Sequence, residues 1–559
     1  MYLNKTQKIL AGSFAAVAAL GTGIGIGAGI WAGGSNGNEV MLVTDGGSIT
    51  DKSFNEQSYD ALNQYGSLTG KSFGYAQPDR KDTTKEGLMR YYNTYLSQDT
   101  NTLVLPGYIH EQALWAIQNK YEDKHFIFID DGGLLYQNQV DPDGLKNADW
   151  GDVITTGSLT QQDLIDNINS GHKTLALTLD KENNRDTSND PGSLYTSNSS
   201  FEVRVYQYID NEDNLVEWNY DNGNQGWGTD ELDKGSVPTA WSSVDNVSSI
   251  KYNSEETGFA VGIIGSYYVT SKFDNPAEWN LGGWVGLAIP TTIDFMSGYV
   301  QGVNFFNEYI FGETGGNPFY YADSSTTNIV KVLSPKGTDK TNSNGSYSVG
   351  NVMTDSNSDS WATGGFESDK GESYPKLLMD KNVNAIFPVA GPQTSWALQK
   401  AKDDVKVIGV DTNAKDVYNY DSKVLTSALK VINSPIDSDA KTDQDKANSG
   451  GPVVKAMYDY GKHGVTLDYV GSFANNGVSF VDDETTKSVY SDWFDKHNYN
   501  NINTDLKTYL PTDLENSSFT ELIPLFINYI NSEGIALTGD KNLVGLQQID
   551  NTYFNNFNQ

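Results

Sequence analysis

The sequence predicts an α/β protein whose two lobes, each a doubly wound parallel sheet, form a clamshell. Short apolar runs alternate with amphipathic stretches from Glu39 onwards, which is typical of strand and helix units around a parallel sheet. The same pattern begins again at Gly258 after a long interruption, and so predicts a second lobe. The length of 559 residues allows for this, since compact domains average about 150 residues. In such a fold, ligands are held where the carboxyl ends of strands from both lobes face each other.

The first lobe is expected at residues 38–137 and opens with a buried strand at 40–44. A helix at 54–65 follows, with Ser53 as the candidate N-cap. The remaining elements of this lobe are expected as strands at 72–76, 102–105 and 125–129 and helices at 84–97 and 111–121.

The second lobe is expected at residues 248–411, with a polar loop rich in Gly and Ser at 334–368. Its expected elements are strands at 284–288, 328–333, 385–389 and 405–410, and helices at 259–270, 293–309 and 395–402 and before Met379. Residues 412–463 are then expected to return to the first lobe and residues 464–482 to the second. Hinges are therefore expected near Tyr252, Thr412 and Gly464.

Residues 138–247 interrupt this pattern and are interpreted as a β-rich insertion. The segment is rich in Asn, Asp, Gly and Ser, and two runs in it, at 173–179 and 201–208, alternate with period two. Its tryptophans are assigned to a small core, with a partner-binding or carbohydrate-binding module as the alternative; they are Trp150, Trp218, Trp227 and Trp241.

A C-terminal extension at residues 483–559 is predicted to be helical. Five apolar residues share one helix face at spacings of three and four, namely Leu522, Leu525, Phe526, Tyr529 and Ile530. Pro524 fits such a helix only in its first turn, where its missing N–H leaves no bond unmade.

The segment 1–37 is interpreted as a membrane anchor. Residues 9–34 carry no charge and are largely apolar, and about 20 helical residues span a bilayer. Lys5 and Lys8 before this stretch predict that the globular part lies outside the plasma membrane. A cleaved secretory signal is the alternative, and it exports the chain equally. The stripe of Gly21, Gly25 and Gly29 offers a surface for self-association of such helices.

Composition excludes several classes of function. The net charge of −34 repels phosphates and anionic lipids, so a nucleic-acid partner is not expected. The chain has no cysteine, which removes disulfides, thiolate metal sites and a lipid-modified cysteine. None of its five histidines pairs with another at the spacing of a helical metal site. We therefore expect no metal, no cofactor and no enzymatic activity.

Three aspartates follow predicted buried strands directly, namely Asp45, Asp130 and Asp411. Each alone is explained by capping of the next helix. Together they favour a cleft lined with carboxylates, because the carboxyl ends of parallel strands meet at one edge of a sheet.

Several segments resemble the basic membrane protein family, the purine-nucleoside-binding receptors of ABC importers, which have a type I periplasmic-binding-protein-like fold. The strongest likeness is LVTDGGSITDKSFNEQSYDAL at 42–62. Matching segments follow in order, among them FIFID at 126–130, VNAIFPVAG at 383–391, VIGVD at 407–411 and VLTSALK at 424–430.

The resemblance implies roles for residues on both lobes. Phe54 and Phe387 stand where family members stack the purine between two rings, a contact that every base tolerates. Asp45 matches the carboxylate that binds the base, and Asn55 and Asp130 are further candidates at similar positions. An ionised carboxylate only accepts hydrogen bonds, so it favours N–H donors on the base.

The resemblance also implies a sugar site. Asp411 and Lys430 match the ligands of the ribose hydroxyls. Gly391 belongs to a turn whose backbone approaches the sugar, but here it is followed by Pro392, which lacks the backbone donor.

The predicted function is that of an extracellular receptor that binds a purine nucleoside and delivers it to an ABC permease in the same membrane. A surface adhesin or structural interaction protein with a lost or altered ligand is the alternative, favoured by the insertion and by Pro392. A nucleoside hydrolase or phosphorylase is disfavoured, because no histidine or further carboxylate pair falls at the strand ends.

Overall fold

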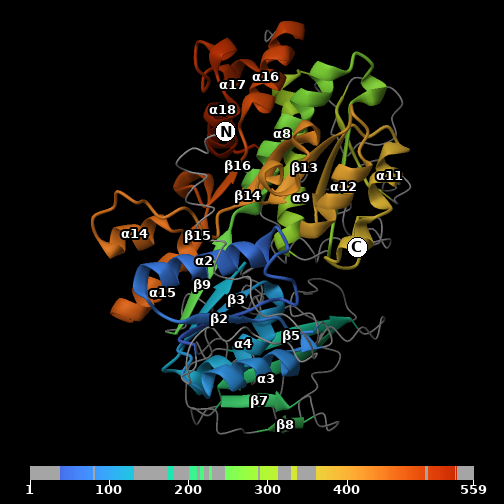
Figure 1. Ribbon diagram of the computed structural model, residues 1–559. Coiled ribbons are helices and arrows are strands. Elements are labelled where there is room, and N and C mark those ends of the chain that lie inside the picture. Colours follow the sequence, from blue (N-terminus) through green and yellow to red (C-terminus); the bar gives the residue numbers. More distant parts are fainter. Residues whose placement is uncertain are drawn as a thin grey trace.

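The computed structural model describes residues 38–79, 82–130, 246–287, 290–312, 329–335, 361–497, 501–535 and 537, and four strands between residues 174 and 228. Within these ranges the chain forms two six-stranded sheets, each with helices on both faces (Figure 1). The prediction of a two-lobed α/β fold is confirmed at this level.

The first lobe has the strand order β15-β9-β4-β3-β1-β2, and all of its pairings are parallel. Its strands are β1 (Val40–Val43), β2 (Phe73–Ala76), β3 (Thr102–Pro106), β4 (His125–Ile129), β9 (Val247–Tyr252) and β15 (Asp468–Gly471). Its helices are α2 (Phe54–Thr69), α3 (Lys85–Leu96), α4 (Glu111–Ile117), α14 (Asp443–Ser449) and α15 (Pro452–His463). Alternate side chains of β1 point to opposite faces of the sheet. Leu42 packs in the hydrophobic cluster with α2 and α15, and Met41 packs in the cluster with α3 and α4.

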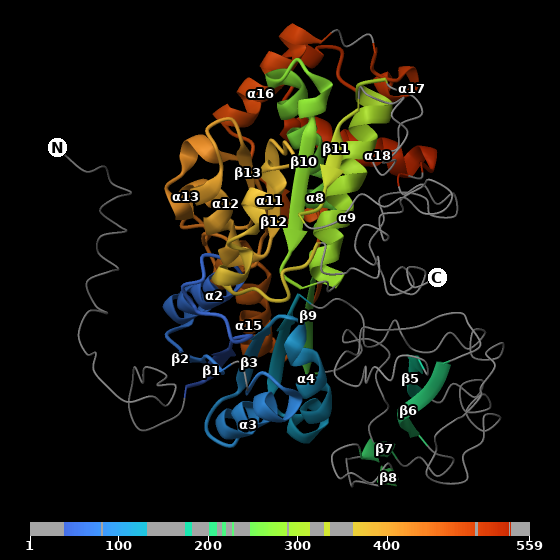
Figure 2. The same ribbon diagram turned by 90° about the vertical axis from the view of Figure 1, so that its right-hand side faces the viewer.

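The second lobe has the strand order β11-β10-β12-β13-β14-β16, with only β16 antiparallel to its neighbour. Figure 2 shows β11, β10, β12 and β13 side by side in this sheet. Its strands are β10 (Asn280–Val285), β11 (Lys331–Leu333), β12 (Ala385–Val389), β13 (Lys406–Asp411), β14 (Val424–Lys430) and β16 (Val478–Phe480). Helices α8 (Ser254–Lys272) and α9 (Pro290–Phe305) pack on one face, and α11 (Tyr374–Met379) and α12 (Thr394–Lys400) pack on the other. A short helix, α13 (Ala414–Tyr418), joins β13 to β14.

The chain changes lobes at three points, two of which differ from the expected hinges. The first change follows Tyr252, as expected, because β9 ends there and α8 begins the second lobe. The second was expected at Thr412, but β14 still pairs with β13, so the change follows Lys430. The third was expected at Gly464, but β15 pairs with β9 of the first lobe and ends at Gly471. Strands β14 and β15 each extend their sheet by one more parallel pairing, which a boundary drawn at the end of the preceding strand or helix does not reveal.

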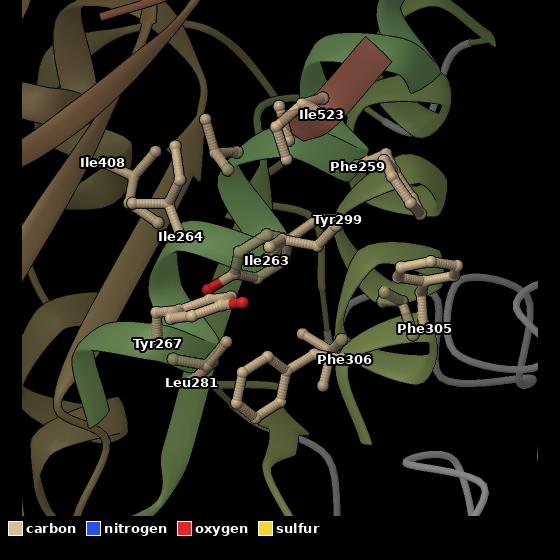
Figure 3. Close-up of a cluster of buried hydrophobic side chains, with 14 of the residues drawn as sticks. Phe259, Ile263, Ile264, Tyr267, Leu281, Tyr299, Phe305, Phe306, Ile408 and Ile523 are labelled. Carbon is tan, nitrogen blue, oxygen red and sulfur yellow. The ribbon is translucent and has the colours of Figure 1, made fainter. Parts of the chain in front are cut away.

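Helix α8 lies at the centre of the second lobe and is buried along most of its length (Figure 3). Its contact with α9 is made through glycines on both helices. A Cβ on Gly262 would collide with the carbonyl oxygen of Tyr299, and one on Gly302 with that of Phe259. The two backbones therefore touch directly, and larger residues at these positions would separate them.

The C-terminal extension covers the outer side of α8. Its helices are α16 (Glu484–Lys496), α17 (Thr504–Lys507) and α18 (Phe519–Glu533). The rings of Trp493 and Phe519 lie 4.7 and 5.1 Å from that of Tyr267 on α8. Helix α18 was expected, but it begins earlier than Pro524 allows for a first-turn proline, so this proline lies inside the helix. Burial of Leu522 and Phe526 against the lobe offsets the lost backbone bond.

The four further strands form an antiparallel sheet, as expected of the insertion. They are β5 (Thr174–Asp180), β6 (Phe201–Ile209), β7 (Leu215–Asn219) and β8 (Gly226–Gly228). The expected membrane segment at 9–34, with its stripe of Gly21, Gly25 and Gly29, lies outside the described residues. Among the helices within the described ranges, none combines the length and apolarity that a bilayer crossing requires.

Candidate functional site

The carboxyl ends of β1 and β4 meet those of β12, β13 and β14 where the lobes touch. The polar contacts that join the lobes here include two hydrogen bonds and an ion pair. The hydroxyl of Ser53 donates to Oδ2 of Asp411 at 2.8 Å, and Nε2 of Gln57 donates to the Asp411 carbonyl oxygen at 2.9 Å. Nζ of Lys430 reaches Oδ1 of Asp130 at 2.6 Å. Of the eight residues assigned to the site from the sequence, all except Phe387 lie in this junction or directly behind it.

Asp45 and Asn55 form the first-lobe side of the junction. Oδ1 of Asp45 accepts from the Gly47 backbone N–H and from Nδ2 of Asn55, both at 2.9 Å. The same Nδ2 also donates to Oδ2 of Asp51 at 2.8 Å. Asn55 is only 3% exposed, so its amide is fixed between two carboxylates.

Asp51 explains why α2 begins where it does. Its carboxylate accepts backbone N–H groups from Ser53 at 2.9 Å and from Asn55 and Glu56 at 3.2 Å. These are the unpaired donors of a helix N-terminus, and a carboxylate satisfies them well. The side chain of Ser53, the expected cap, makes no capping bond and instead reaches the second lobe.

Two site aspartates hold the backbone in the left-handed region. The φ angles of Asp130 and Asp411 are +67° and +62°, at the ends of β4 and β13. Such a conformation costs free energy outside glycine and is found preferentially at functional sites. In both residues it redirects the chain where the strand ends, and both carboxylates contact the opposite lobe.

Aromatic rings from both lobes surround the Lys430 ammonium. Nζ lies 5.8 Å from the ring centroid of Phe54, 5.9 Å from that of Tyr252 and 4.9 Å from that of Phe295. These distances are within the range of cation–π attraction. Phe54 is partly exposed, whereas Phe295 is nearly fully buried.

Phe387 is not beside Phe54, contrary to the expected pair of facing rings. It is fully buried in the middle of β12, and its ring packs 5.1 Å from Tyr299 and 6.2 Å from Phe295. A mid-strand side chain points to one face of the sheet rather than beyond its end. Phe295 of α9 is therefore the second-lobe ring at the junction. Phe54 was assigned from the resemblance alone. Its position in the first turns of a helix after a buried strand is shared by Phe295, and that shared position is the signal that could have indicated Phe295.

The site carries more carboxylates than positive charges. Burial raises the pKa of Asp45, and hydrogen bonds from Gly47 and Asn55 oppose that rise. Burial also raises the pKa of Asp411, and the Lys430 ammonium opposes it. The acids together outnumber Lys430, so the junction offers mainly hydrogen-bond acceptors. Within the described ranges, no group of three or more acidic or histidine side chains could hold a metal ion.

The turn after β12 differs from a flexible glycine-rich loop. Gly391 has φ +47°, and a Cβ there would lie 3.1 Å from the Ser53 hydroxyl oxygen, so this glycine permits close contact between the lobes. Gly391 also begins a short 3-10 helix, Gly391–Gln393, with Pro392 as its second residue. Gln393 is buried, accepting from Nε1 of Trp284 at 2.9 Å and donating to the Gly365 carbonyl at 2.7 Å. The turn is therefore held in place by side-chain bonds.

No family model matches the chain. It is similar to an uncharacterized lipoprotein of Mycoplasma pneumoniae, with 28% identity over 193 residues covering 30% of this chain and 29% of that protein. It is also similar to an uncharacterized lipoprotein of Mycoplasma genitalium, with 25% identity over 274 residues covering 44% of this chain and 46% of that protein. The matches thus span less than half the length of either relative.

Among solved structures, the chain is similar to an ABC transporter solute-binding protein from Aeropyrum pernix, with 13% identity and a TM-score of 0.43. That likeness covers 89% of this chain and 86% of the other. A transcriptional activator from Bacillus halodurans matches with 12% identity and a TM-score of 0.38, covering 80% of this chain and 94% of the other. Likenesses this distant do not bear on function.

Proposed function

We propose that the protein is a solute receptor of the basic membrane protein type, which binds a purine nucleoside between its lobes and presents it to an ABC permease in the same membrane. The observation that supports this most directly is the meeting of strand-end carboxylates, Lys430 and two aromatic rings from opposite lobes at one junction. A ligand held there contacts both lobes at once, so its binding favours their closure.

Each part of a nucleoside has a chemical counterpart in the junction. The rings of Phe54 and Phe295 offer apolar faces for the base, and Asp45 offers a carboxylate for its N–H donors. Asp411 accepts from a ribose hydroxyl and Lys430 donates to one, so the vicinal diol is matched by an acid and an amine. Lys430 must then exchange its bond with Asp130 for a sugar hydroxyl. Capture of the nucleoside requires no covalent step, so the proposed role is that of a binding protein rather than an enzyme.

The proposed location is the outer face of the plasma membrane. The two curated relatives are named as lipoproteins. This chain contains no cysteine to carry a lipid, so residues 9–34 are the proposed anchor, with the globular part outside, or secreted if that segment is cleaved. Packing of these segments through Gly21, Gly25 and Gly29 remains a proposed route to self-association.

A thermal-shift measurement on the full-length chain in detergent tests the proposal. Guanosine, inosine or adenosine should raise the melting temperature, because a ligand at 100 times its Kd stabilises the folded form by about 2.7 kcal/mol. Phe54→Ala and Asp45→Ala should abolish the rise, whereas Tyr420→Ala, at an exposed ring, should keep it. Release of free base during the assay would indicate an enzyme instead.

A second candidate is a surface interaction protein that has lost its ligand. It is favoured by the way the junction is occupied by the chain's own groups, since Lys430 is paired with Asp130 and Ser53 with Asp411. A folded chain whose melting temperature no nucleoside changes would support this candidate and exclude the receptor.

A further inference from the structure

The polar atoms at the start of α2 can be divided into those that have partners and those that do not. Both N–H groups of the Asn55 amide are used, one by Oδ1 of Asp45 and the other by Oδ2 of Asp51. The amide is therefore fixed in orientation, and only its Oδ1 remains. This oxygen is buried and has no hydrogen-bond partner.

The neighbouring carboxylates are occupied to different extents. Asp51 accepts from three backbone N–H groups and from Asn55, so both of its oxygens are engaged. In Asp45, Oδ1 accepts two bonds and Oδ2 is left over. A Cβ at Gly107 would lie 3.4 Å from Oδ2, so the glycine leaves space beside this oxygen. The two groups that remain, Oδ2 of Asp45 and Oδ1 of Asn55, are both acceptors.

A buried acceptor without a donor costs free energy until a donor arrives. Resting on the proposed nucleoside function, we infer that Asp45 and Asn55 select a base edge with two adjacent N–H donors, which is the N1–H and 2-amino edge of guanine. Hypoxanthine offers N1–H but no 2-amino group. Adenine presents its N1 acceptor to the same oxygens, which is repulsive. Asn55 is thus the residue that distinguishes guanosine from inosine, and the order of affinity is guanosine, inosine, adenosine.

Calorimetric titration of the full-length chain with these three nucleosides tests the inference. Guanosine should bind about tenfold or more tightly than inosine, which is the effect of one buried hydrogen bond. In Asn55→Ala the ratio of the two affinities should fall towards one. Because the ratio is taken within one variant, a general loss of folding cancels. Thr44→Val is the matched control, since it removes another buried oxygen without a partner at the end of β1, and it should keep the ratio.

A second ligand pair keeps the test independent of the variant. On the unmodified chain, 2-aminoadenosine should bind more tightly than adenosine, because it adds the same donor. Equal affinity for guanosine and inosine, or an unchanged ratio in Asn55→Ala, overturns the role of Asn55 while leaving the receptor proposal intact. A folded chain that binds none of these nucleosides overturns the receptor proposal itself.

Discussion

Lys430 determines how the carboxylates of Asp130 and Asp411 coexist where the lobes meet. Its side chain is 3% exposed, and it pairs with Asp130, whose side chain is 13% exposed. A buried ion pair recovers its desolvation cost only with good geometry and further favourable contacts. The rings of Phe54, Tyr252 and Phe295 supply such contacts. The lysine also opposes the raised pKa of Asp411, so its charge acts on carboxylates of both lobes.

The raised pKa values of Asp45 and Asp411 predict opposite pH effects on stability and on binding. Both groups bind a proton more readily when folded than when unfolded, where the ordinary value of 3.8 applies. Their contribution to the free energy of unfolding therefore increases as the pH falls from 7 through the raised folded pKa towards 3.8. Ligand affinity should decrease over the same range, because protonation converts an acceptor into a donor.

The measurement is the difference between the wild type and Asp45→Asn, followed as melting temperature and as guanosine affinity across this pH range. The variant carries no titrating group at position 45, so the acid-induced gain in stability should be smaller in it than in the wild type. General acid effects of a chain with net charge −34 are common to both proteins and cancel. A larger acid-induced gain in the variant would contradict the assignment.

At the scale of elements, the contact between α8 and α9 positions the second-lobe part of the site. Gly258 and Gly262 of α8 face the backbone of α9, and Gly298 and Gly302 of α9 face the backbone of α8. The same helix α9 carries Phe295, whose ring lies beside Lys430. The spacing of the helices therefore determines how far this ring reaches towards the first lobe.

Substitution of Gly262 by leucine should lower both stability and affinity. The new Cβ meets a backbone carbonyl that cannot move aside, and overpacking of this kind costs roughly 1–3 kcal/mol or more. Gly265→Ala is the control on the same helix, since its Cβ would lie 3.2 Å from a Leu281 methyl that can rotate. Denaturant unfolding measures the first effect and nucleoside titration the second. Equal midpoints for the two variants would refute a backbone-to-backbone contact.

The bounds of strands built from continuous apolar runs could be predicted closely. The bounds of elements that are short or contain glycines could not. The strands at 125–129 and 385–389 were predicted with the bounds of β4 and β12. The strand expected at 284–288 lies instead at Asn280–Val285, because Gly282 and Gly283 conceal its start. The resemblance implied that Phe387 lies at the junction, but a position on a strand does not tell which face of the sheet the side chain packs on, and Phe387 is buried within the second lobe. Pairings between residues hundreds of positions apart, such as Asp130 with Lys430, depend on the packing of whole lobes.

For the whole molecule, a set of contacts away from the proposed ligand groups joins the rims of the lobes. Nζ of Lys52 donates to the Val417 carbonyl at 2.7 Å and lies 4.9 Å from the Tyr418 ring centroid. The Thr412 hydroxyl donates to the Lys52 carbonyl at 2.8 Å. We call these contacts of Lys52 with Thr412, Val417 and Tyr418 the latch. Lys52 itself has φ +58°, so the backbone is strained where the latch forms. These bonds exist only when the lobes are together, and they therefore stabilise closure.

Removal of the latch should weaken binding without changing specificity. Lys52→Ala loses one hydrogen bond and one cation–π contact, each worth about 1 kcal/mol, so the ratio of closed to open molecules should fall by roughly tenfold or more. Apparent affinity decreases by the same factor for every nucleoside, because only closed molecules hold the ligand tightly. Lys71→Ala provides the control, since Lys71 pairs with Glu39 inside the first lobe. Small-angle scattering should show a larger radius of gyration for Lys52→Ala than for Lys71→Ala without ligand. If the two variants scatter alike, or if Lys52→Ala alters the ratio of guanosine to inosine affinity, the latch is not a separate closing device.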